Sequence, residues 1–240
     1  ACLVGSEMCI RDSQTIDYAR SLEEKFGKKF RFTITTNGLL LDDAKIDYIN
    51  ANMSNVVLSI DGRPSVNDGM RKTVNGGGSY DVIVPKFKKL VEQRDPNLDY
   101  YARGTFTGKN LDFADDVLHI ADEGFDSLSV EPVAAEDGCG YELTDADFDK
   151  ICAEYDRLTD IIEQRRKEGK PFHFFHFMVD LNQGPCVVKR LRGCGAGYEY
   201  VAVTPEGDIY PCHQFVGNED FKQGSIMDGT FDLDIAHKFA

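Results

Sequence analysis

The feature of this sequence that most restricts its fold is a regular alternation of strand-like and helix-like segments. The strand-like segments, rich in β-branched and aromatic side chains, are residues 30–36, 56–60, 100–107 and 128–133. The helix-like segments are residues 15–26, 111–121 and 144–167, and two further helices can begin near Asp42 and Ser79. This alternation predicts an α/β fold of about four repeated units, with parallel strands joined by right-handed crossovers. An open sheet and a barrel both fit it.

Polar side chains gather where the predicted strands end. The residues at these strand ends are Asn37, then Ser59 with Asp61, then Arg103 with Thr105 and Thr107, and finally Glu131. Parallel α/β folds assemble their active sites at the carboxyl ends of successive strands, so we expect these groups to share one site. The alternative is that strand ends are turns, and turns are polar because they face water.

The pattern of the chain changes after residue 170, where a small second domain is expected. An aromatic, strand-like run at residues 173–179 precedes a stretch rich in Gly and Cys that has neither helical nor strand periodicity. Residues 198–203 and 208–210 then flank the sequence Thr-Pro-Glu-Gly, which is typical of a β-hairpin turn. The second domain is therefore expected to be organised around something other than a hydrophobic core.

Three cysteines of this second domain form the strongest chemical signal. Twelve residues separate Cys194 from Gly207, and four more separate Gly207 from Cys212, so a hairpin of this length brings both thiols together. Cys186 lies close enough in the chain to join them. Thiolates suit iron–sulfur clusters or zinc, and the absence of CxxC pairs makes zinc the weaker interpretation. The alternative is three buried cysteines that act as small apolar residues.

The first 13 residues are set apart from the predicted fold. The segment LVGSEMCIRDS, from Leu3 to Ser13, resembles the translation of a transposase adapter used in sequencing libraries; the alternative is an ordinary flexible N-terminus. The cysteines that remain are Cys139, Cys152, Cys186, Cys194 and Cys212. Their number is odd and no export signal is evident, which argues against a disulfide framework. Cys139 and Cys152 have no cysteine partner at cluster spacing.

Composition excludes two classes of partner. The formal net charge of -14 repels a phosphate backbone, and the basic residues are scattered, so no nucleic acid is expected as a partner. No apolar run approaches the roughly 20 residues that a membrane-spanning helix needs, so no membrane is expected either. The sequence therefore predicts a soluble, cytoplasmic protein.

Several segments together resemble radical S-adenosylmethionine (SAM) enzymes of the SPASM type. TITTNG at residues 33–38 is similar to the third barrel strand of that family, and LSIDG at residues 58–62 is similar to the fourth. The segments DLNQGPC, YYARGTFTGKNLDF and GCGAGYEYVAVTPEGDIYPCHQFVGNE resemble maturases that install thioether links in six-cysteine (SCIFF) peptides. The likeness extends from residue 14 to the C-terminus.

The resemblance implies a fold and a set of ligands. Residues 14–170 would form a partial parallel (β/α) radical SAM barrel containing strands three to six. Residues 171–240 would begin a small SPASM or twitch-type auxiliary cluster domain with a β-hairpin. The residues implied in SAM binding are Asn37, Ser59, Asp61 and Arg103, with Arg103 pairing with the SAM carboxylate.

The resemblance also implies [4Fe–4S] clusters. Cys194 and Cys212, with Cys186, would be ligands of an auxiliary cluster, and His213 could donate to its sulfur or face solvent. The family's catalytic cluster is held by a CxxxCxxC motif that this sequence lacks, and the later cysteines that complete the auxiliary clusters are absent too. We therefore expect a fragment that cannot cleave SAM by itself.

The function implied for the parent enzyme is oxidoreductase-type peptide maturation. It would cleave SAM reductively to a 5′-deoxyadenosyl radical, and the radical would abstract hydrogen from a cysteine-rich precursor peptide, which then closes a thioether. One alternative is another SPASM enzyme that modifies peptides or proteins, of the sulfatase-maturase type. The other is a non-catalytic module that binds metal or peptide. Neither the catalytic residues nor the oligomeric state can be assigned.

Overall fold

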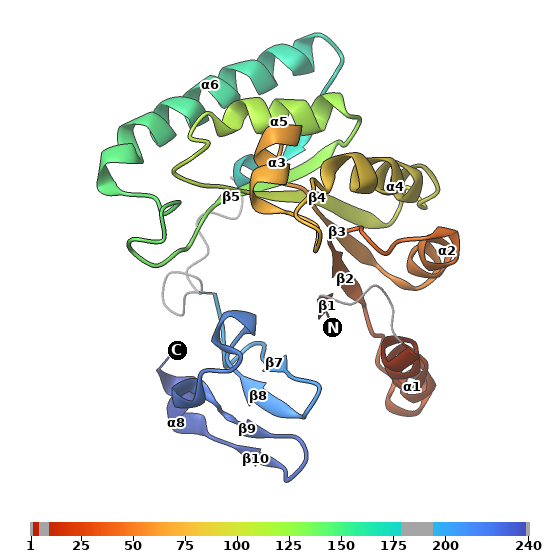
Figure 1. Ribbon diagram of the computed structural model, residues 1–240. Coiled ribbons are helices and arrows are strands. Elements are labelled where there is room, and N and C mark those ends of the chain that lie inside the picture. Colours follow the sequence, from red (N-terminus) through yellow and green to blue (C-terminus); the bar gives the residue numbers. More distant parts are fainter. Residues whose placement is uncertain (1, 5–9, 179–193, 239–240) are drawn as a thin grey trace. The chain divides into compact units, whose positions relative to one another are not determined.

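The computed structural model describes residues 2–4, 10–178 and 194–238. The chain divides into two compact units, Ala1–Met178 (unit 1) and Val179–Ala240 (unit 2), which are considered separately (Figure 1). None of the helices in the described ranges combines the length and apolar character needed to cross a membrane.

Unit 1 is built on a six-stranded parallel sheet. Its strands are β1 (Cys2–Val4), β2 (Thr33–Thr36), β3 (Asn55–Ser59), β4 (Asp99–Phe106), β5 (Ser127–Pro132) and β6 (His173–Phe174). Each strand pairs in parallel with the next one along the chain. The predicted α/β fold with parallel strands is confirmed. The short strand β1 falls in the segment set apart as adapter-like, whose origin stays a prediction.

Helices connect successive strands. They are α1 (Ile10–Phe26), α2 (Asp43–Asn52), α3 (Pro64–Met70), α4 (Tyr80–Glu92), α5 (Phe113–Asp122) and α6 (Phe148–Lys167). Asp42 caps α2 as expected, because its carboxylate accepts a hydrogen bond from the backbone N–H of Lys45 at 2.9 Å. The short helix α3 is not evident from the sequence pattern; Pro64 occupies its first turn, where the missing N–H of proline has no cost.

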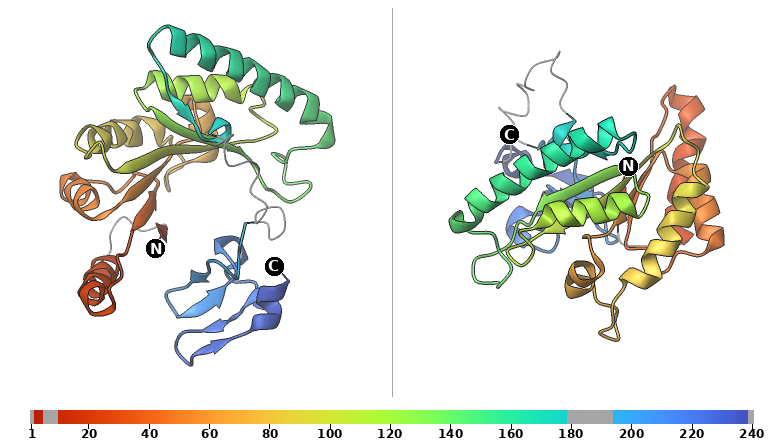
Figure 2. Two further views of the ribbon diagram at one scale, coloured as in Figure 1. Left: turned by 180° about the vertical axis from the view of Figure 1, so that it is seen from behind. Right: turned by 90° about the horizontal axis from the view of Figure 1, so that it is seen from above.

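The two faces of the sheet have different surroundings. Alternate strand residues such as Val56 and Leu58 are fully buried in the core cluster, while Val57 and Ser59 of the same strand point to the opposite face and are only partly buried. Figures 1 and 2 show helices α2, α4, α5 and α6 along one face of the sheet. We call the opposite face the inner face.

The predicted aromatic strand at residues 173–179 is shorter than expected. Strand β6 ends at Phe174, and Phe175–Phe177 forms a single turn of 3₁₀-helix. In that turn residues three apart share a face, which lets Phe177 pack against Phe174 with ring centroids 5.3 Å apart. Phe172 and Phe174 belong to the core of unit 1, although residues 171–178 were grouped with the second domain on sequence.

Unit 2 contains a four-stranded antiparallel sheet with the order β10-β9-β8-β7. Its elements are β7 (Ala202–Val203), β8 (Asp208–Tyr210), β9 (Gly224–Ser225), β10 (Thr230–Phe231) and the helix α8 (Leu233–His237). Strands β7 and β8 form the predicted hairpin across Thr204 and Gly207, whose backbone N–H bonds the carbonyl of Thr204 at 3.0 Å. The hairpin is therefore confirmed.

Candidate functional site

Three of the four predicted SAM-binding residues lie together at the carboxyl ends of the strands. Ser59 and Arg103 are register partners across the β3–β4 pair, so their side chains leave the same face of the sheet. Asn37 follows β2 directly after the pair that Thr36 forms with Leu58 of β3, which places it next to Ser59 along the sheet edge. The exposed side chain of Asn37 accepts a hydrogen bond from the N–H of Leu39 at 3.1 Å.

A cavity opens on the inner face beside Arg103. It has a volume of about 230 Å³ and is lined by Val57, Tyr101, Arg103, Ser129, Glu131 and Phe175. The rings of Tyr101 and Phe175 meet edge to face, with centroids 6.1 Å apart. The cavity thus combines an aromatic and aliphatic wall with one cation and one anion, a combination typical of small-ligand sites.

Arg103 is held by an ion pair across neighbouring strands. Its Nη2 lies 2.8 Å from Oε2 of Glu131, and the hydroxyl of Ser129 donates to Oε1 of the same carboxylate at 3.0 Å. Burial acts to raise the pKa of Glu131, but the hydrogen bond and charge of Arg103 outweigh it and lower that pKa below its ordinary value. Glu131 is therefore an anion at neutral pH.

Asp61, the fourth predicted residue, has its carboxylate engaged within the protein. Nε and Nη2 of Arg71 each donate to one of its oxygens at 2.8 Å, and the backbone N–H of Thr105 donates to Oδ1 at 3.1 Å. The side chain of Asp61 is 5% exposed. Through these hydrogen bonds, Asp61 connects the segment that follows β3 to strand β4. Its direct contact with SAM stays a prediction.

Further buried groups order the segment that follows Asp61. Asn67 accepts from the N–H of Asp61 at 3.3 Å and donates to Oγ of Ser79 at 3.1 Å. The carboxylate of Asp68 accepts from the N–H groups of Ser79 and Tyr80, each at 2.8 Å, at the start of α4. This network fixes the segment between β3 and α4, which includes α3, at the edge of the candidate site.

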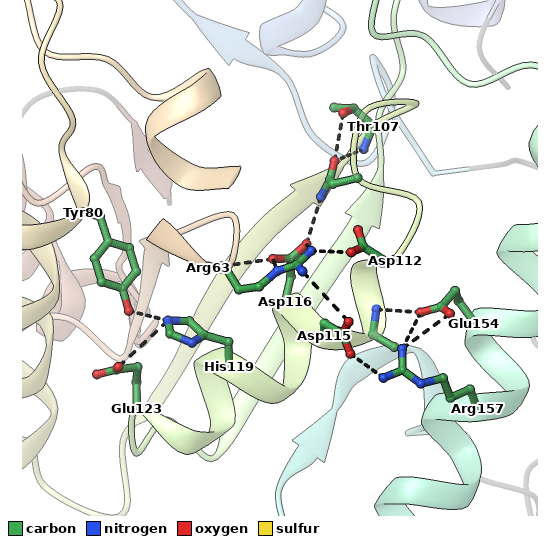
Figure 3. A network of polar contacts seen from close by, with 12 residues as sticks. Arg63, Tyr80, Thr107, Asp112, Asp115, Asp116, His119, Glu123, Glu154 and Arg157 are labelled. Carbon is green, nitrogen blue, oxygen red and sulfur yellow. Dashed lines mark hydrogen bonds and ion pairs between the residues drawn. The ribbon is translucent and has the colours of Figure 1, made fainter. Parts of the chain in front are cut away.

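A second network lies behind the strand ends (Figure 3). Asp116 of α5 is fully buried, and its Oδ1 accepts from Nε of Arg63 at 2.8 Å and from the Arg63 backbone N–H at 3.0 Å. Asn110 donates to Oδ2 at 3.1 Å and accepts from the N–H and hydroxyl of Thr107 at 2.8 Å each. Gly62 has a φ of +141°, and any Cβ there would lie 2.3 Å from Asp116. The network joins the ends of β3 and β4 to α5.

His176 and Tyr155 lie near Glu131. The hydroxyl of Tyr155 is 2.9 Å from Nδ1 of His176. Burial lowers the pKa of His176 below its ordinary value, although the charge of Glu131 acts in the opposite direction. Burial and the same charge raise the pKa of Tyr155. Both rings are therefore neutral at pH 7.

In unit 2, two of the three predicted thiol ligands lie near one tyrosine. The hydroxyl of Tyr200 is 3.8 Å from Sγ of Cys194. Burial, the hydrogen bond with Cys194 and the charges of Cys194 and Cys212 raise the pKa of Tyr200 to about 12. The backbone explains this proximity, because the N–H of Gly197 bonds the carbonyl of Pro211 at 2.9 Å. Both cysteines are free thiols, with Cys194 exposed and Cys212 buried.

The metal site itself stays a prediction. Cys186 lies outside the described residues, and no group of three or more His, Cys, Asp or Glu side chains within the described ranges is arranged to hold a metal. Cys139 and Cys152 are exposed free thiols in unit 1. His213 is exposed beside Cys212, in keeping with the solvent-facing alternative.

The thiol of Cys194 provides one testable consequence. Its pKa is lowered, first by a hydrogen bond from the backbone of Ala196 and then by the hydroxyl of Tyr200. We expect Tyr200→Phe to raise this pKa toward the ordinary thiol value, so that the alkylation rate of Cys194 at neutral pH falls. Peptide mapping after iodoacetamide treatment at several pH values measures this rate. Tyr18→Phe, an exposed tyrosine of α1, should leave the rate unchanged; equal rates in all three proteins would contradict the contact.

Sequence reasoning did not identify Ser129, Arg71, Asp116 or the aromatic wall as parts of the site. A signal existed for Ser129: it lies two residues before Glu131, so both side chains leave the same face of a strand. No comparable signal points to Arg71 or Asp116, because their partners lie 10 and 53 residues away in the chain.

Comparison with protein-family models finds no match, and neither does comparison with curated protein sequences. Solved structures are similar in fold. The structure of native anSMEcpe with bound AdoMet (S-adenosylmethionine) matches with a TM-score of 0.73 and 20% identity, over 99% of this chain and 67% of that chain. The structure of anSMEcpe with AdoMet and the Cp18Cys peptide matches with a TM-score of 0.70 and 18% identity, over 96% of this chain and 65% of that chain.

A further match is SuiB of Streptococcus suis bound to S-adenosylmethionine. Its TM-score is 0.61 at 17% identity, over 93% of this chain and 51% of that chain. The chain therefore spans about two thirds of the length of anSMEcpe and about half of SuiB. Both neighbours are radical SAM enzymes. We conclude that the chain has the partial-barrel fold of radical SAM enzymes.

Proposed function

We propose that this chain is part of a radical SAM enzyme that modifies a peptide, in which unit 1 binds SAM and unit 2 contributes ligands to an auxiliary [4Fe–4S] cluster. The observation that carries the proposal is the grouping of Ser59 and Arg103 on the inner face, at the carboxyl ends of neighbouring strands. Parallel α/β folds bind their ligands at this edge. The bound S-adenosylmethionine of the structural neighbours supports the same ligand here.

The chemistry of the inner face fits SAM. The guanidinium of Arg103 can pair with the carboxylate of the amino-acid end, and the hydroxyl of Ser59 and the amide of Asn37 can bond ribose hydroxyls. The aromatic wall of Tyr101 and Phe175 gives apolar surface for the remainder. A bound SAM would supply the radical chemistry, while the residues of this chain would orient it and exclude water.

The thiols of unit 2 fit an iron–sulfur cluster in part. Cys194 lies beside the hydroxyl of Tyr200, and the hydrogen bond from Gly197 to Pro211 brings the residue before Cys212 close to the Cys194 turn. A lowered pKa favours Cys194 as the thiolate that metal binding requires. We assign Cys186 as the third ligand on the sequence pattern alone. Soft thiolate ligands favour iron–sulfur clusters or zinc over harder ions.

For the substrate we propose a cysteine-rich precursor peptide, in which a cysteine sulfur is joined to carbon as a thioether. The sequence likeness to maturases of six-cysteine peptides supports this choice. The complex of anSMEcpe with the Cp18Cys peptide supports a peptide as the class of substrate. The alternative within the same class is an enzyme of the sulfatase-maturase type. Mass spectrometry of a candidate peptide co-expressed with the parent enzyme separates the two: a thioether link lowers the mass by two hydrogens.

Anaerobic reconstitution tests the cluster assignment. We expect the chain, supplied with iron and sulfide and then desalted, to retain both elements, with loss of most of them in Cys194→Ser and Cys212→Ser. Cys152→Ser, which replaces an exposed thiol of unit 1, should retain as much as the wild type. Iron, zinc and sulfide analysis of the four proteins measures this. One zinc per chain without sulfide would instead indicate a zinc-binding module.

A further inference from the structure

In the ion pair between Arg103 and Glu131, both carboxylate oxygens accept a hydrogen bond, whereas the guanidinium uses only one of its donors among the described residues. Both oxygens of Glu131 have a donor, since Arg103 lies at 2.8 Å from one and the hydroxyl of Ser129 at 3.0 Å from the other. Only Nη2 of Arg103 has a hydrogen-bond partner within the described ranges. The guanidinium carries several more N–H donors, and these remain available to a ligand.

The pair forms the polar part of the cavity on the inner face. Val57, Tyr101 and Phe175 provide its apolar walls. Such walls displace water from one side of the guanidinium, and charge–charge contacts are stronger where water is excluded. Arg103 is nevertheless 51% exposed, so packing alone does not fix its long side chain.

We propose that Glu131 is a positioning residue: it holds the guanidinium of Arg103 so that the remaining donors face the cavity and receive the carboxylate of SAM. This inference rests on the proposed function, because it takes SAM as the ligand. Without Glu131, the side chain of Arg103 would sample many rotamers and lose that freedom on binding. Glu131 also opposes ligand binding, since its own carboxylate neutralises Arg103. Fixing the Arg103 side chain raises the affinity for the ligand, and neutralising its charge lowers it. Positioning is the larger of these two effects.

Binding of S-adenosylhomocysteine, measured by isothermal titration calorimetry, separates the two effects. We expect Glu131→Ala to weaken binding about 3- to 10-fold, the usual effect of having to immobilise one flexible side chain. Glu131→Gln should bind at least as tightly as the wild type, because the amide oxygen accepts the same hydrogen bond from Arg103 and carries no charge that neutralises it. Binding of 5′-methylthioadenosine, which lacks the amino-acid end, should be the same in all three proteins.

Two further variants complete the test. Glu163→Ala removes the carboxylate of an exposed ion pair with Lys167 on α6 and should leave binding unchanged. If Glu131→Ala does not fold, Ser129→Ala should weaken binding in the same direction, because it removes the hydroxyl that supports Glu131. Failure of the wild type to bind S-adenosylhomocysteine would overturn the proposed function itself. If the wild type binds S-adenosylhomocysteine, and Glu131→Ala or Ser129→Ala binds it as tightly as the wild type or more tightly, only the positioning role would be overturned.

Discussion

Replacing Asp116 by Ala is expected to lower the free energy of unfolding of unit 1 by about 3 kcal/mol, because several hydrogen-bond donors lose a fully buried carboxylate acceptor. Asp116 is fully buried, and it accepts hydrogen bonds from Arg63 and Asn110. Its loss leaves the guanidinium of Arg63 without its most buried partner and the amide of Asn110 without an acceptor. Urea unfolding followed by circular dichroism at 222 nm measures the change, because the long helices belong to unit 1.

The same helix offers a matched control. Asp122 of α5 also pairs with an arginine, Arg165, at 2.7 Å, but its side chain is 63% exposed. We expect Asp122→Ala to change the free energy of unfolding by less than about 1 kcal/mol. If the two variants lost similar stability, the network of Asp116 would not be what holds the strand ends to α5.

Replacing Arg103 by Met is expected to weaken the binding of S-adenosylhomocysteine by about 30-fold or more. A hydrogen bond to a charged group commonly contributes about 1.5–3 kcal/mol, and Arg103→Met loses the bond that the guanidinium would donate to the ligand carboxylate. Methionine retains much of the aliphatic length of arginine, so the cavity wall keeps its packing while the charge is lost. Isothermal titration calorimetry measures the effect, and 5′-methylthioadenosine should bind equally to both proteins.

A surface arginine provides the comparison for Arg103. Arg31 forms an ion pair with Asp99 at 3.3 Å in which both side chains are largely exposed. Arg31→Met makes the same change in net charge, and we expect it to leave binding within about 2-fold of the wild type. Equal losses in the two variants would show that net charge, rather than the position of Arg103, determines affinity.

The parallel α/β architecture could be predicted because it depends on local patterns. Strand β3 appears in the sequence as a short apolar run and β5 as a short alternating segment, and the polar residues at their carboxyl ends mark the edge where Ser59 and Glu131 lie. The hairpin of unit 2 follows from the turn residues between β7 and β8. Each of these features is encoded within a few neighbouring residues.

The partners of the site residues could not be predicted, because they depend on contacts between distant segments. The position of Asp61 at a strand end predicts a contact with a ligand. In the structure its carboxylate instead accepts hydrogen bonds from Arg71, which follows the unexpected helix α3. The pairing of Arg103 with Glu131 requires the register between β4 and β5, which no local pattern specifies. Beyond the early end of β6, Phe177 packs on Phe174, a contact that the aromatic run in the sequence does not reveal.

Hydrogen–deuterium exchange of the chain with and without saturating S-adenosylhomocysteine tests the central claim most directly. We expect the ligand to protect the peptides that contain the carboxyl ends of β2, β3, β4 and β5, including those with Ser59 and Arg103. Peptides at the opposite, amino-terminal ends of the strands, around Pro96 and Gly124, should be unaffected. Protection confined to those amino-terminal ends, or no protection in unit 1 at saturating ligand, would contradict a SAM site on the inner face.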